Sequence, residues 1–533
     1  ELCDVIHSVD REKIVKSIGS AILPDGRSLS QSLTIDGIPY WEVFASELAS
    51  RYIPSAFGKD GYSELISQLA KPILVKSKYF IRDLAHLYKN SDEYTKESLS
   101  NRILCLEFMP QQSRDVMQPV VRYLADQKDA QIISLRDKKW ATVKDNFNSN
   151  ELRKTIWDFW NDDLSMKASV LNRQLKSIKK NLINSKALEK IIDTSAPDIK
   201  KSIQRALNRL FIGEFSTLIR QGVISKFIFE KHRPTLVIAT DIHDPRTRIY
   251  MLQCKHFRIP CLALQHGLTN SAAIEWRFFP ADRVAVWGKH FKETLISHGI
   301  ASDKIVVTGA PRSDSLFKSS NFKAKSIKRE LGIPTKARIV LLASTFVLGS
   351  YDRLNNDAEL LEAMKRAVFD SVNGLENLYL IVKPHPEENQ NEIKSFTSNN
   401  PKIIFVDQKQ DIRPLTKICD CFVSFGSTTA MDAILLDKLV VCPAFPGWQW
   451  SNTCIDTGVV YAPVSPEEIH DIFRLVSISN HTVLIDKHQY NREKLVSNWL
   501  YRHDGMCAER IGNLALNMRS RHKKIKEVSS SIN

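Results

Sequence analysis

Carboxylates, histidines and hydroxyls gather directly after short apolar runs of this sequence. The stretch ATDIHDPR, residues 239–246, contains Asp241, His243 and Asp244. An Asp-x-x-Asp pair can bind a hard cation, but Asp244 before Pro245 also suits a helix N-cap. Asp241 is nearest the end of the apolar run, so we interpret it as the group that takes a proton or attacks a substrate, with His243 beside it.

A second stretch, Gln265-His266-Gly267, ends another apolar run. Glycine has no side chain, so a substrate can approach the His266 imidazole closely. A histidine at the end of a strand is often purely structural. We favour a functional role for His266 because several other expected strands also end in polar residues.

The stretch IVKPHPEE, residues 381–388, restrains a histidine between two prolines. Proline fixes its own φ and biases the residue before it toward extended conformations. Such a rigid exit from a strand suits a ligand contact, although an ordinary turn would have the same pattern. We interpret four residues here as candidate nucleotide contacts: Lys383, His385, Pro386 and Glu387.

The stretch VSFGSTTAMD, residues 423–432, has the pattern of a strand, a tight glycine turn and a helix start. Unpaired N–H groups at a helix start, together with hydroxyls, can bind phosphate. Simple N-capping by Ser427 or Thr428 is compatible with that role. The candidate nucleotide contacts are Gly426, Ser427, Thr428, Thr429, Asp432 as a ribose contact, and Ser344 at the end of a further run.

These polar residues require strands to position them. Apolar runs separated by helical patterns predict parallel α/β units. The predicted strands of the first series are 102–109, 130–135, 235–241, 259–267, 283–288 and 304–311. Those of the second are 337–345, 378–386, 402–407, 419–427 and 438–445. Ligands bind outside the carboxyl ends of strands in such sheets.

The remaining segments complete the expected domain organisation. Residues 1–98 form a mixed extension with a helical pattern of aromatic residues near 40–52, more typical of a core than of a binding stripe. The expected domains are 99–314 for the acceptor and catalysis and 315–512 for the nucleotide. Residues 150–232 are expected to be mostly helical. A basic tail, 513–533, is either solvated or attracted to anionic lipid.

Composition limits the class of protein. The chain has 533 residues, 43% hydrophobic and 25% charged, which is typical of a globular protein of two or three domains. A net charge of +15 favours anionic partners such as a nucleotide or a membrane surface. Nine scattered cysteines without CxxC spacing predict reduced thiols, a cytoplasmic location and no zinc site. No apolar run approaches the length of a membrane span.

Taken in order, these motifs resemble those of bacterial cell-surface polysaccharide glycosyltransferases with the GT-B fold. The elements are Gln265–Gly267, Gly309–Arg312, Lys383–Pro386 and Gly426–Asp432. They look most like transferases that use CMP-activated Kdo or sialic acid. Similar elements occur in CDP-glycerol glycerophosphotransferases, and nucleotide-sugar 2-epimerases share the fold.

The resemblance implies an α/β GT-B fold, with two Rossmann-like domains facing a central cleft. It implies a transferase that moves a Kdo or sialic-acid-like sugar from CMP to a growing capsule or lipopolysaccharide chain. A CDP-glycerol-type phosphotransferase, an epimerase and a non-enzymatic assembly subunit are the alternatives. No metal or other cofactor is expected. The expected partners are the nucleotide donor, a glycan or glycolipid acceptor and the anionic inner membrane, but not nucleic acid.

Overall fold

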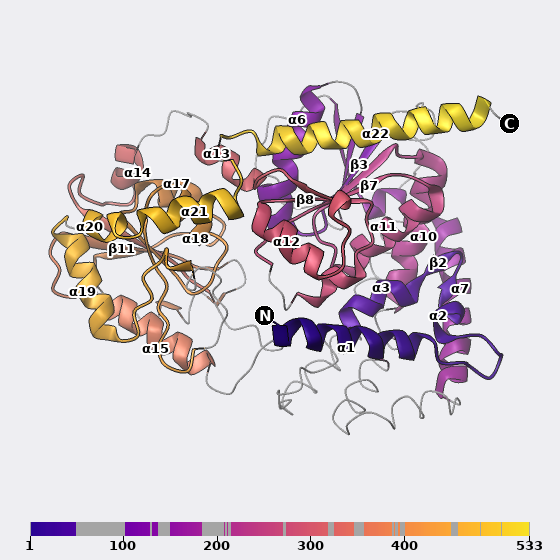
Figure 1. Ribbon diagram of the computed structural model, residues 1–533, viewed down its shortest axis with the longest axis horizontal. Coiled ribbons are helices and arrows are strands. Elements are labelled where there is room, and N and C mark those ends of the chain that lie inside the picture. The colour runs from indigo at the N-terminus through magenta and orange to yellow at the C-terminus, as the bar shows by residue number, and fades with distance from the viewer. Residues whose placement is uncertain are drawn as a thin grey trace. The chain divides into compact units, whose positions relative to one another are not determined.

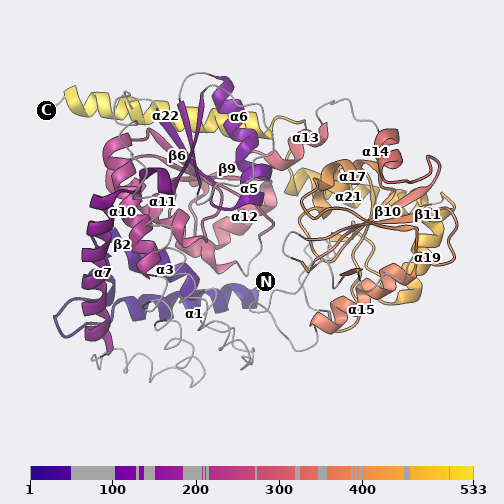
Figure 2. The same ribbon diagram turned by 180° about the vertical axis from the view of Figure 1, so that it is seen from behind.

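The computed structural model divides the chain into two compact units, Glu1–Arg312 with Met506–Asn533, and Ser313–Gly505 (Figure 1; seen from behind in Figure 2). Each unit is described here by itself. The structure describes residues 2–49, 102–127, 131–136, 150–183, 207, 211, 215–269, 273–317, 324–345, 357–385, 388–389, 393–394, 400–448, 457–479, 481–502 and 504–531.

The first unit contains a seven-stranded parallel sheet. Its order is β5-β4-β3-β6-β7-β8-β9. The strands are β3 (Arg102–Leu106), β4 (Gln131–Arg136), β5 (Glu151–Thr155), β6 (Leu236–Ala239), β7 (Cys261–Leu264), β8 (Arg283–Val286) and β9 (Ile305–Val307). Chain order reverses between β3 and β6, and such switch points are where doubly wound sheets bind ligands.

The central strands β3, β6 and β7 are buried along their whole length, as continuous apolar runs predict, and helices pack around the sheet. They are α5 (Pro110–Gln112), the π-helix η3 (Ser113–Met117), α6 (Gln118–Asp126), η4 (Ile156–Phe159), α7 (Asp162–Ile183), α10 (Phe215–His232), α11 (Pro245–Phe257), η6 (Ile274–Phe278), α12 (Lys289–Ser297), η7 (Ser302–Lys304) and α22 (Cys507–Ser531). The short helix η8 (Pro311–Ser313) lies at the boundary where the second unit begins.

The described part of the N-terminal extension packs on the first unit. It consists of α1 (Leu2–Gly19), α2 (Leu29–Ser32), the hairpin β1 (Thr34–Ile35) and β2 (Ile38–Pro39), and α3 (Tyr40–Glu47). As expected from their spacing, Tyr40, Trp41, Phe44 and Leu48 are buried. Phe44 meets Phe215 of α10 edge to face, with ring centroids 4.6 Å apart.

The described residues of 150–232 are mostly helical, as expected, but strand β5 at the start of this segment was not predicted. Its sequence, ELRKT, has no apolar run, because β5 lies at the edge of the sheet and pairs only with β4. Charged residues are common on edge strands, where they discourage pairing with other chains. Helices α7 and α10 follow as expected.

The last helix also differs from the expected domain organisation. Helix α22 packs along α6 of the first unit, as both ribbon views show. Ala508, Ile511, Ala515 and Met518 join the core of that unit, so residues 507–512, expected in the nucleotide domain, and the start of the expected tail from 513 belong to the first unit. A Cβ on Gly512 would lie 2.2 Å from the Tyr123 ring, so glycine is required for this close approach.

The second unit has a five-stranded parallel sheet of order β12-β11-β10-β13-β14. The strands are β10 (Arg338–Ala343), β11 (Leu378–Lys383), β12 (Ile403–Phe405), β13 (Cys421–Ser424) and β14 (Leu439–Val441). The helices are α13 (Asp314–Phe317), α14 (Ala324–Glu330), α15 (Asp357–Asp370), α17 (Ile412–Ile418), α18 (Ala430–Leu435), α19 (Pro466–Ser477), α20 (Thr482–Asp486) and α21 (Gln489–Trp499).

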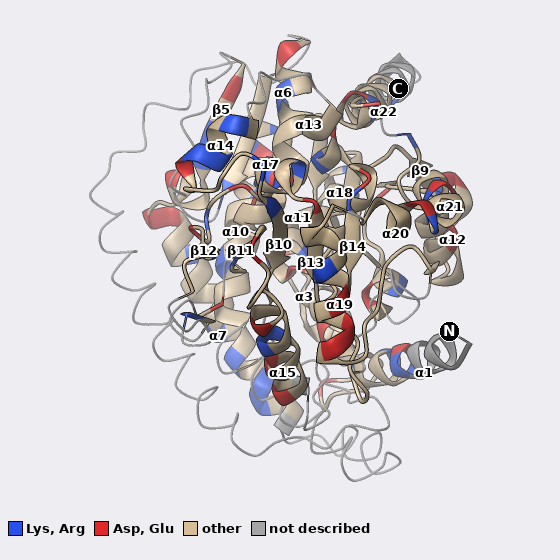
Figure 3. Cartoon of the chain, turned by 90° about the vertical axis from the view of Figure 1, so that its left-hand side faces the viewer, with Lys and Arg blue, Asp and Glu red and all other residues tan. Residues whose placement is uncertain are grey.

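Charges mark the outer sides of the helices in the second unit. Figure 3 shows basic residues on α14 and an acidic first turn on α19. The carboxylates of Glu467 and Glu468 complement the partial positive charge at the start of α19. The apolar sides of α15 and α19 pack on the sheet. Both units are thus Rossmann-like, and the predicted α/β class of the GT-B kind is confirmed.

In the part of the chain that the structure describes, no helix is both long and apolar enough to cross a membrane.

Candidate functional site

Asp241 lies just beyond β6, at the switch point of the first sheet. Its carboxylate accepts hydrogen bonds from the backbone N–H of His243 (2.8 Å) and of Asp244 (3.3 Å). The side-chain amide of Gln112, from α5, donates to its other oxygen at 3.2 Å. The hydroxyl of Thr240 in turn donates to the Gln112 side-chain oxygen at 3.0 Å, which fixes the amide orientation. The carboxylate is therefore held in one orientation.

The surroundings of Asp241 favour its ionised form. Burial alone would raise the pKa of this carboxyl, but the nearby imidazoles of His266 and His243 and the donated hydrogen bonds outweigh burial and lower the pKa. The group is therefore an anion at neutral pH. The stability that it contributes is present above the ordinary pKa of aspartate and is lost as pH falls through the lowered folded-state pKa.

His266 follows β7, the strand next to β6. Its Nδ1 lies 3.3 Å from the carbonyl oxygen of Thr240. A carbonyl can only accept, so this contact favours the tautomer with the proton on Nδ1 and the lone pair on Nε2. The neighbouring Gln265 fixes the loop, because its side-chain oxygen accepts from the Trp287 N–H at 2.9 Å and its amide donates to the Gly267 carbonyl at 2.8 Å.

His243 is paired with a carboxylate that sequence reasoning missed. Its Nε2 lies 3.2 Å from an oxygen of Glu275 in η6. Glu275 lies in a short 3-10 helix rather than at the end of a strand, so the strand-end rule could not find it.

A pocket of about 80 Å³ brings these side chains together within the first unit. Its polar lining consists of Asp241, His243, Gln265, His266, Thr269 and Glu275. Trp276 and Leu268 supply apolar walls. Three of the four catalytic candidates therefore share one pocket, and Asp244 is the candidate that does not line it.

Asp244 is the N-cap of α11. Its carboxylate accepts from the backbone N–H of Arg246 at 2.8 Å and pairs with the Arg246 guanidinium. That guanidinium also lies over the Phe108 ring, 5.3 Å from its centroid. These contacts account for the presence of Asp244 as a helix cap, without any role in substrate binding.

We expect Asp244→Asn to lower the melting temperature modestly and to keep most of the activity. Asparagine still caps a helix but loses the ion pair with Arg246, so the cost should be about 1 kcal/mol or less. Thermal unfolding and transfer rate of the same preparation test this expectation. An inactive variant that melts like the wild type would instead place Asp244 in the chemistry.

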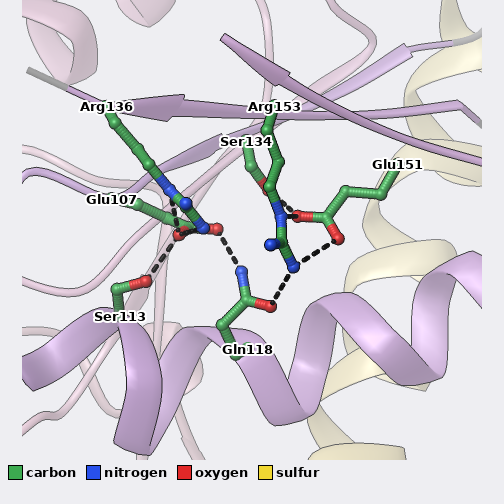
Figure 4. A network of polar contacts seen from close by, with 7 residues as sticks. All are labelled: Glu107, Ser113, Gln118, Ser134, Arg136, Glu151 and Arg153. Carbon is green, nitrogen blue, oxygen red and sulfur yellow. Dashed lines mark hydrogen bonds and ion pairs between the residues drawn. The ribbon is translucent and has the colours of Figure 1, made fainter. Parts of the chain in front are cut away.

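A buried network of charges supports the same end of the sheet (Figure 4). Glu107, 1% exposed, follows β3 and is paired with Arg136 at the end of β4, 2.8 Å away. It also accepts from the hydroxyl of Ser113 (2.5 Å) and the side-chain amide of Gln118 (2.7 Å). Ser113 is adjacent to Gln112, so the network anchors the turn whose amide holds Asp241.

A second pair continues the network on β5. Arg153 is 2.9 Å from Glu151, and its guanidinium also donates to Gln118 at 3.4 Å. Burial would raise the pKa of Glu151, but the hydrogen bonds from Arg153 and Ser134 lower it. The sequence signal for this cluster was weak, because its members are spread over residues 107–153 and lie in no motif.

In the second unit, the His385 loop is anchored by a buried carboxylate that we did not predict. Glu388 accepts from the His385 backbone N–H at 3.0 Å and from the Ser344 hydroxyl at 2.8 Å. Lys365 of α15 is paired with Glu388 at 2.5 Å. Ser344, a predicted nucleotide contact, therefore helps to hold the loop. His385 itself is half-buried after β11.

Lys383 is buried, and its ammonium donates to the carbonyls of Pro384 (2.9 Å) and Gln408 (2.7 Å). These bonds tie the end of β11 to the loop after β12 and give Lys383 a structural role. Pro386 and Glu387, the other two candidates of this motif, lie outside the described residues.

The glycine turn after β13 forms as predicted, but helix α18 begins only at Ala430, and its N-cap is Thr429, without a side-chain cap bond, rather than Ser427 or Thr428. Gly426 has φ +110°, which favours glycine. The hydroxyls of Ser427 and Thr429 lie 2.8 Å apart, and the Ser427 backbone N–H donates to the Ser424 hydroxyl. Gly426, Ser427, Thr428 and Thr429 are all half-buried, so they retain accessible surface.

Asp432 corrects one prediction. It is 0% exposed inside α18, and the Ser313 hydroxyl donates to it at 3.4 Å. A fully buried carboxylate offers no surface to a ribose. Its place one turn into the helix directs it to the core instead of the strand ends.

The two Rossmann-like units give the fold, and one known family matches part of the chain. Residues 289–517 match the sequence model of the family described as CDP-Glycerol:Poly(glycerophosphate) glycerophosphotransferase. The matched segment includes His385 and the turn after β13, but not Asp241 or His266. No curated protein matches the chain.

Several solved structures resemble the fold. A variant of the wall teichoic acid polymerase TagF is 10% identical and has a TM-score of 0.49, over 87% of this chain and 99% of that one. The S. aureus MnaA–UDP structure is 14% identical and has a TM-score of 0.48, over 77% of this chain and 94% of that one. UDP-GlcNAc 2-epimerase from Neisseria meningitidis bound to UDP-GlcNAc is 16% identical and has a TM-score of 0.47, over 78% of this chain and 100% of that one.

Proposed function

We propose that the protein is a CDP-glycerol-type phosphotransferase, which moves a polyol phosphate from a CDP-activated donor to a hydroxyl of a growing surface polymer. The observation that carries this proposal is the family match over residues 289–517. It favours the phosphotransferase alternative over transfer of Kdo or sialic acid, for which the comparisons give no support. The first unit would supply the catalytic groups, and the second would bind the nucleotide.

The proposed donor site is built from the strand ends of the second unit. His385 would contact the diphosphate, with its backbone fixed by Glu388. The hydroxyls of Ser427 and Thr429 would donate to phosphate oxygens. The turn at Gly426 leaves the backbone accessible, as phosphate sites require.

The proposed reaction is a displacement at phosphorus. The acceptor hydroxyl oxygen attacks the phosphorus that bears the polyol, a new P–O bond forms, and the bond to the CMP oxygen breaks. The hydroxyl proton goes to Nε2 of His266, and CMP leaves with the electron pair of the broken bond. Asp241 stabilises the resulting imidazolium, and the pKa of Asp241 is lowered by that same imidazole. No metal is required in this proposal.

The test is a donor comparison with the purified full chain and a glycerol phosphate oligomer as acceptor. CDP-glycerol, CMP-Kdo, CMP-sialic acid and UDP-GlcNAc are each supplied, with and without EDTA, and products are measured by mass spectrometry. We expect one added glycerol phosphate per CMP released, from CDP-glycerol and with EDTA present. Transfer of Kdo or sialic acid, or epimerisation of UDP-GlcNAc, in place of this product would overturn the proposal.

We further expect cytidine nucleotides to stabilise the wild-type protein more than UMP, UDP or GDP, and His385→Ala to lose most of that effect. A ligand at ~100 times its dissociation constant adds about 2.7 kcal/mol to stability. Thermal shift with CMP measures it. His470→Ala, on α19 of the same unit, is the matched control. An unchanged CMP shift in His385→Ala would make the histidine purely structural.

A further inference from the structure

We infer that the pocket of the first unit binds an uncharged, hydroxyl-rich group, the polyol end of the acceptor, and that Thr269 recognises one of its hydroxyls. The assignment to the acceptor rests on the proposed function. The chemistry of the pocket comes from the structure alone.

Thr269 is the residue that points to a ligand. It is 8% exposed and lines the pocket. Its hydroxyl is buried and has no hydrogen-bond partner among the residues that the structure describes. Buried hydroxyls are nearly always paired, because an unpaired one loses its bonds to water without compensation. A hydroxyl of a bound molecule would supply the missing partner.

The charges of the pocket select against anions. Asp241 and Glu275 are carboxylates, and no lysine or arginine is among the lining residues. Arg248 is buried but does not line the pocket, and its guanidinium donates to the backbone carbonyls of Ile242 (3.0 Å) and Phe278 (2.7 Å). The carboxylates of Asp241 and Glu275 would repel a phosphate or carboxylate that lies close to them, whereas alcohol O–H groups can donate to both.

The size and walls of the pocket also fit a polyol. A water occupies at least ~10–15 Å³ by the same measure, so about 80 Å³ holds roughly half a dozen non-hydrogen atoms. Trp276 is 5% exposed and stacks near Phe279, with ring centroids 6.3 Å apart, so its ring is a rigid wall. A three-carbon polyol could place its C–H groups on this wall and its hydroxyls on the polar side.

The experiment measures binding without requiring turnover. Saturation-transfer NMR with glycerol as the probe is recorded for the full chain, for Thr269→Val and for the matched control Thr294→Val on α12. We expect wild type and control to bind glycerol alike, and Thr269→Val to bind about three- to tenfold more weakly, the usual worth of one neutral hydrogen bond. Inorganic phosphate should not displace glycerol.

Each outcome decides the inference. Absence of glycerol binding to the wild type, equal binding by Thr269→Val, or displacement by phosphate would each overturn it. Glu275→Gln supplies a second check, because removal of one negative charge should let phosphate compete with glycerol. If glycerol binds through Thr269 but CDP-glycerol is not turned over, the proposed donor is wrong and the hydroxyl site stands. If transfer occurs but Thr269→Val binds normally, the site inference alone fails.

Discussion

Asp241→Asn should fold normally and bind CMP, yet lose at least ~100-fold in transfer rate, the low end for removal of a general acid or base partner. The amide keeps the size of the carboxylate and its contact with Gln112. It cannot carry the negative charge that stabilises a protonated His266. The measurement is the rate of glycerol phosphate transfer beside the thermal shift with CMP.

Two variants make this result interpretable. Asp303→Asn, at an exposed position of the same unit, should leave both measurements unchanged. If Asp241→Asn keeps its activity while Asp244→Asn loses it and stays folded, our assignment of the two carboxylates is reversed. If both stay active, the essential acid lies elsewhere in the chain.

Glu107→Ala should destabilise the first unit by about 3–5 kcal/mol, the cost of leaving a buried charge without its partner. The substitution removes the acceptor of Arg136, which is 7% exposed, and two further hydrogen bonds from Ser113 and Gln118. Because the chain has two units, a single melting temperature mixes their transitions. Hydrogen exchange of the peptides that contain β3 and β4 reports on the first unit directly.

The control is Glu293→Ala, which removes an exposed pair with Lys289, 3.7 Å apart on α12. Such surface pairs contribute about 0–1 kcal/mol, so exchange in β3 and β4 should not change. If Glu107→Ala exchanges like this control, the network in Figure 4 is not what holds the strand ends together.

The strands and the polar residues at their ends were predictable, because continuous apolar runs and the carboxyl-end rule depend on local sequence alone. That rule placed Asp241 and His266 at strand ends, and the structure shows that the two strands are neighbours and that both residues line one pocket. Strand β5 was missed because an edge strand of ELRKT has no apolar signal. The N-terminal aromatic residues were assigned to the core correctly because helical spacing reports burial directly.

The supporting residues were not predictable, because their roles depend on contacts between distant segments. The Gln112 side chain donates to Asp241, which is 129 residues away in the sequence, and Lys365 donates to Glu388, which is 23 residues away. The prediction that Asp432 contacts a ribose was wrong for the opposite reason. A local motif suggested an exposed side chain, but the packing of α18 buries it.

The return of the last helix to the first unit has a consequence for biosynthesis. Helix α22 completes the core around Val120 and Leu124 of α6, but it is translated only after the roughly 200 residues of the second unit. At ~5–20 residues per second, the ribosome needs roughly 10 to 40 s for that stretch. For this time, the nascent first unit leaves exposed the part of α6 that α22 later covers. A stop codon anywhere before residue 507 would leave that surface permanently bare.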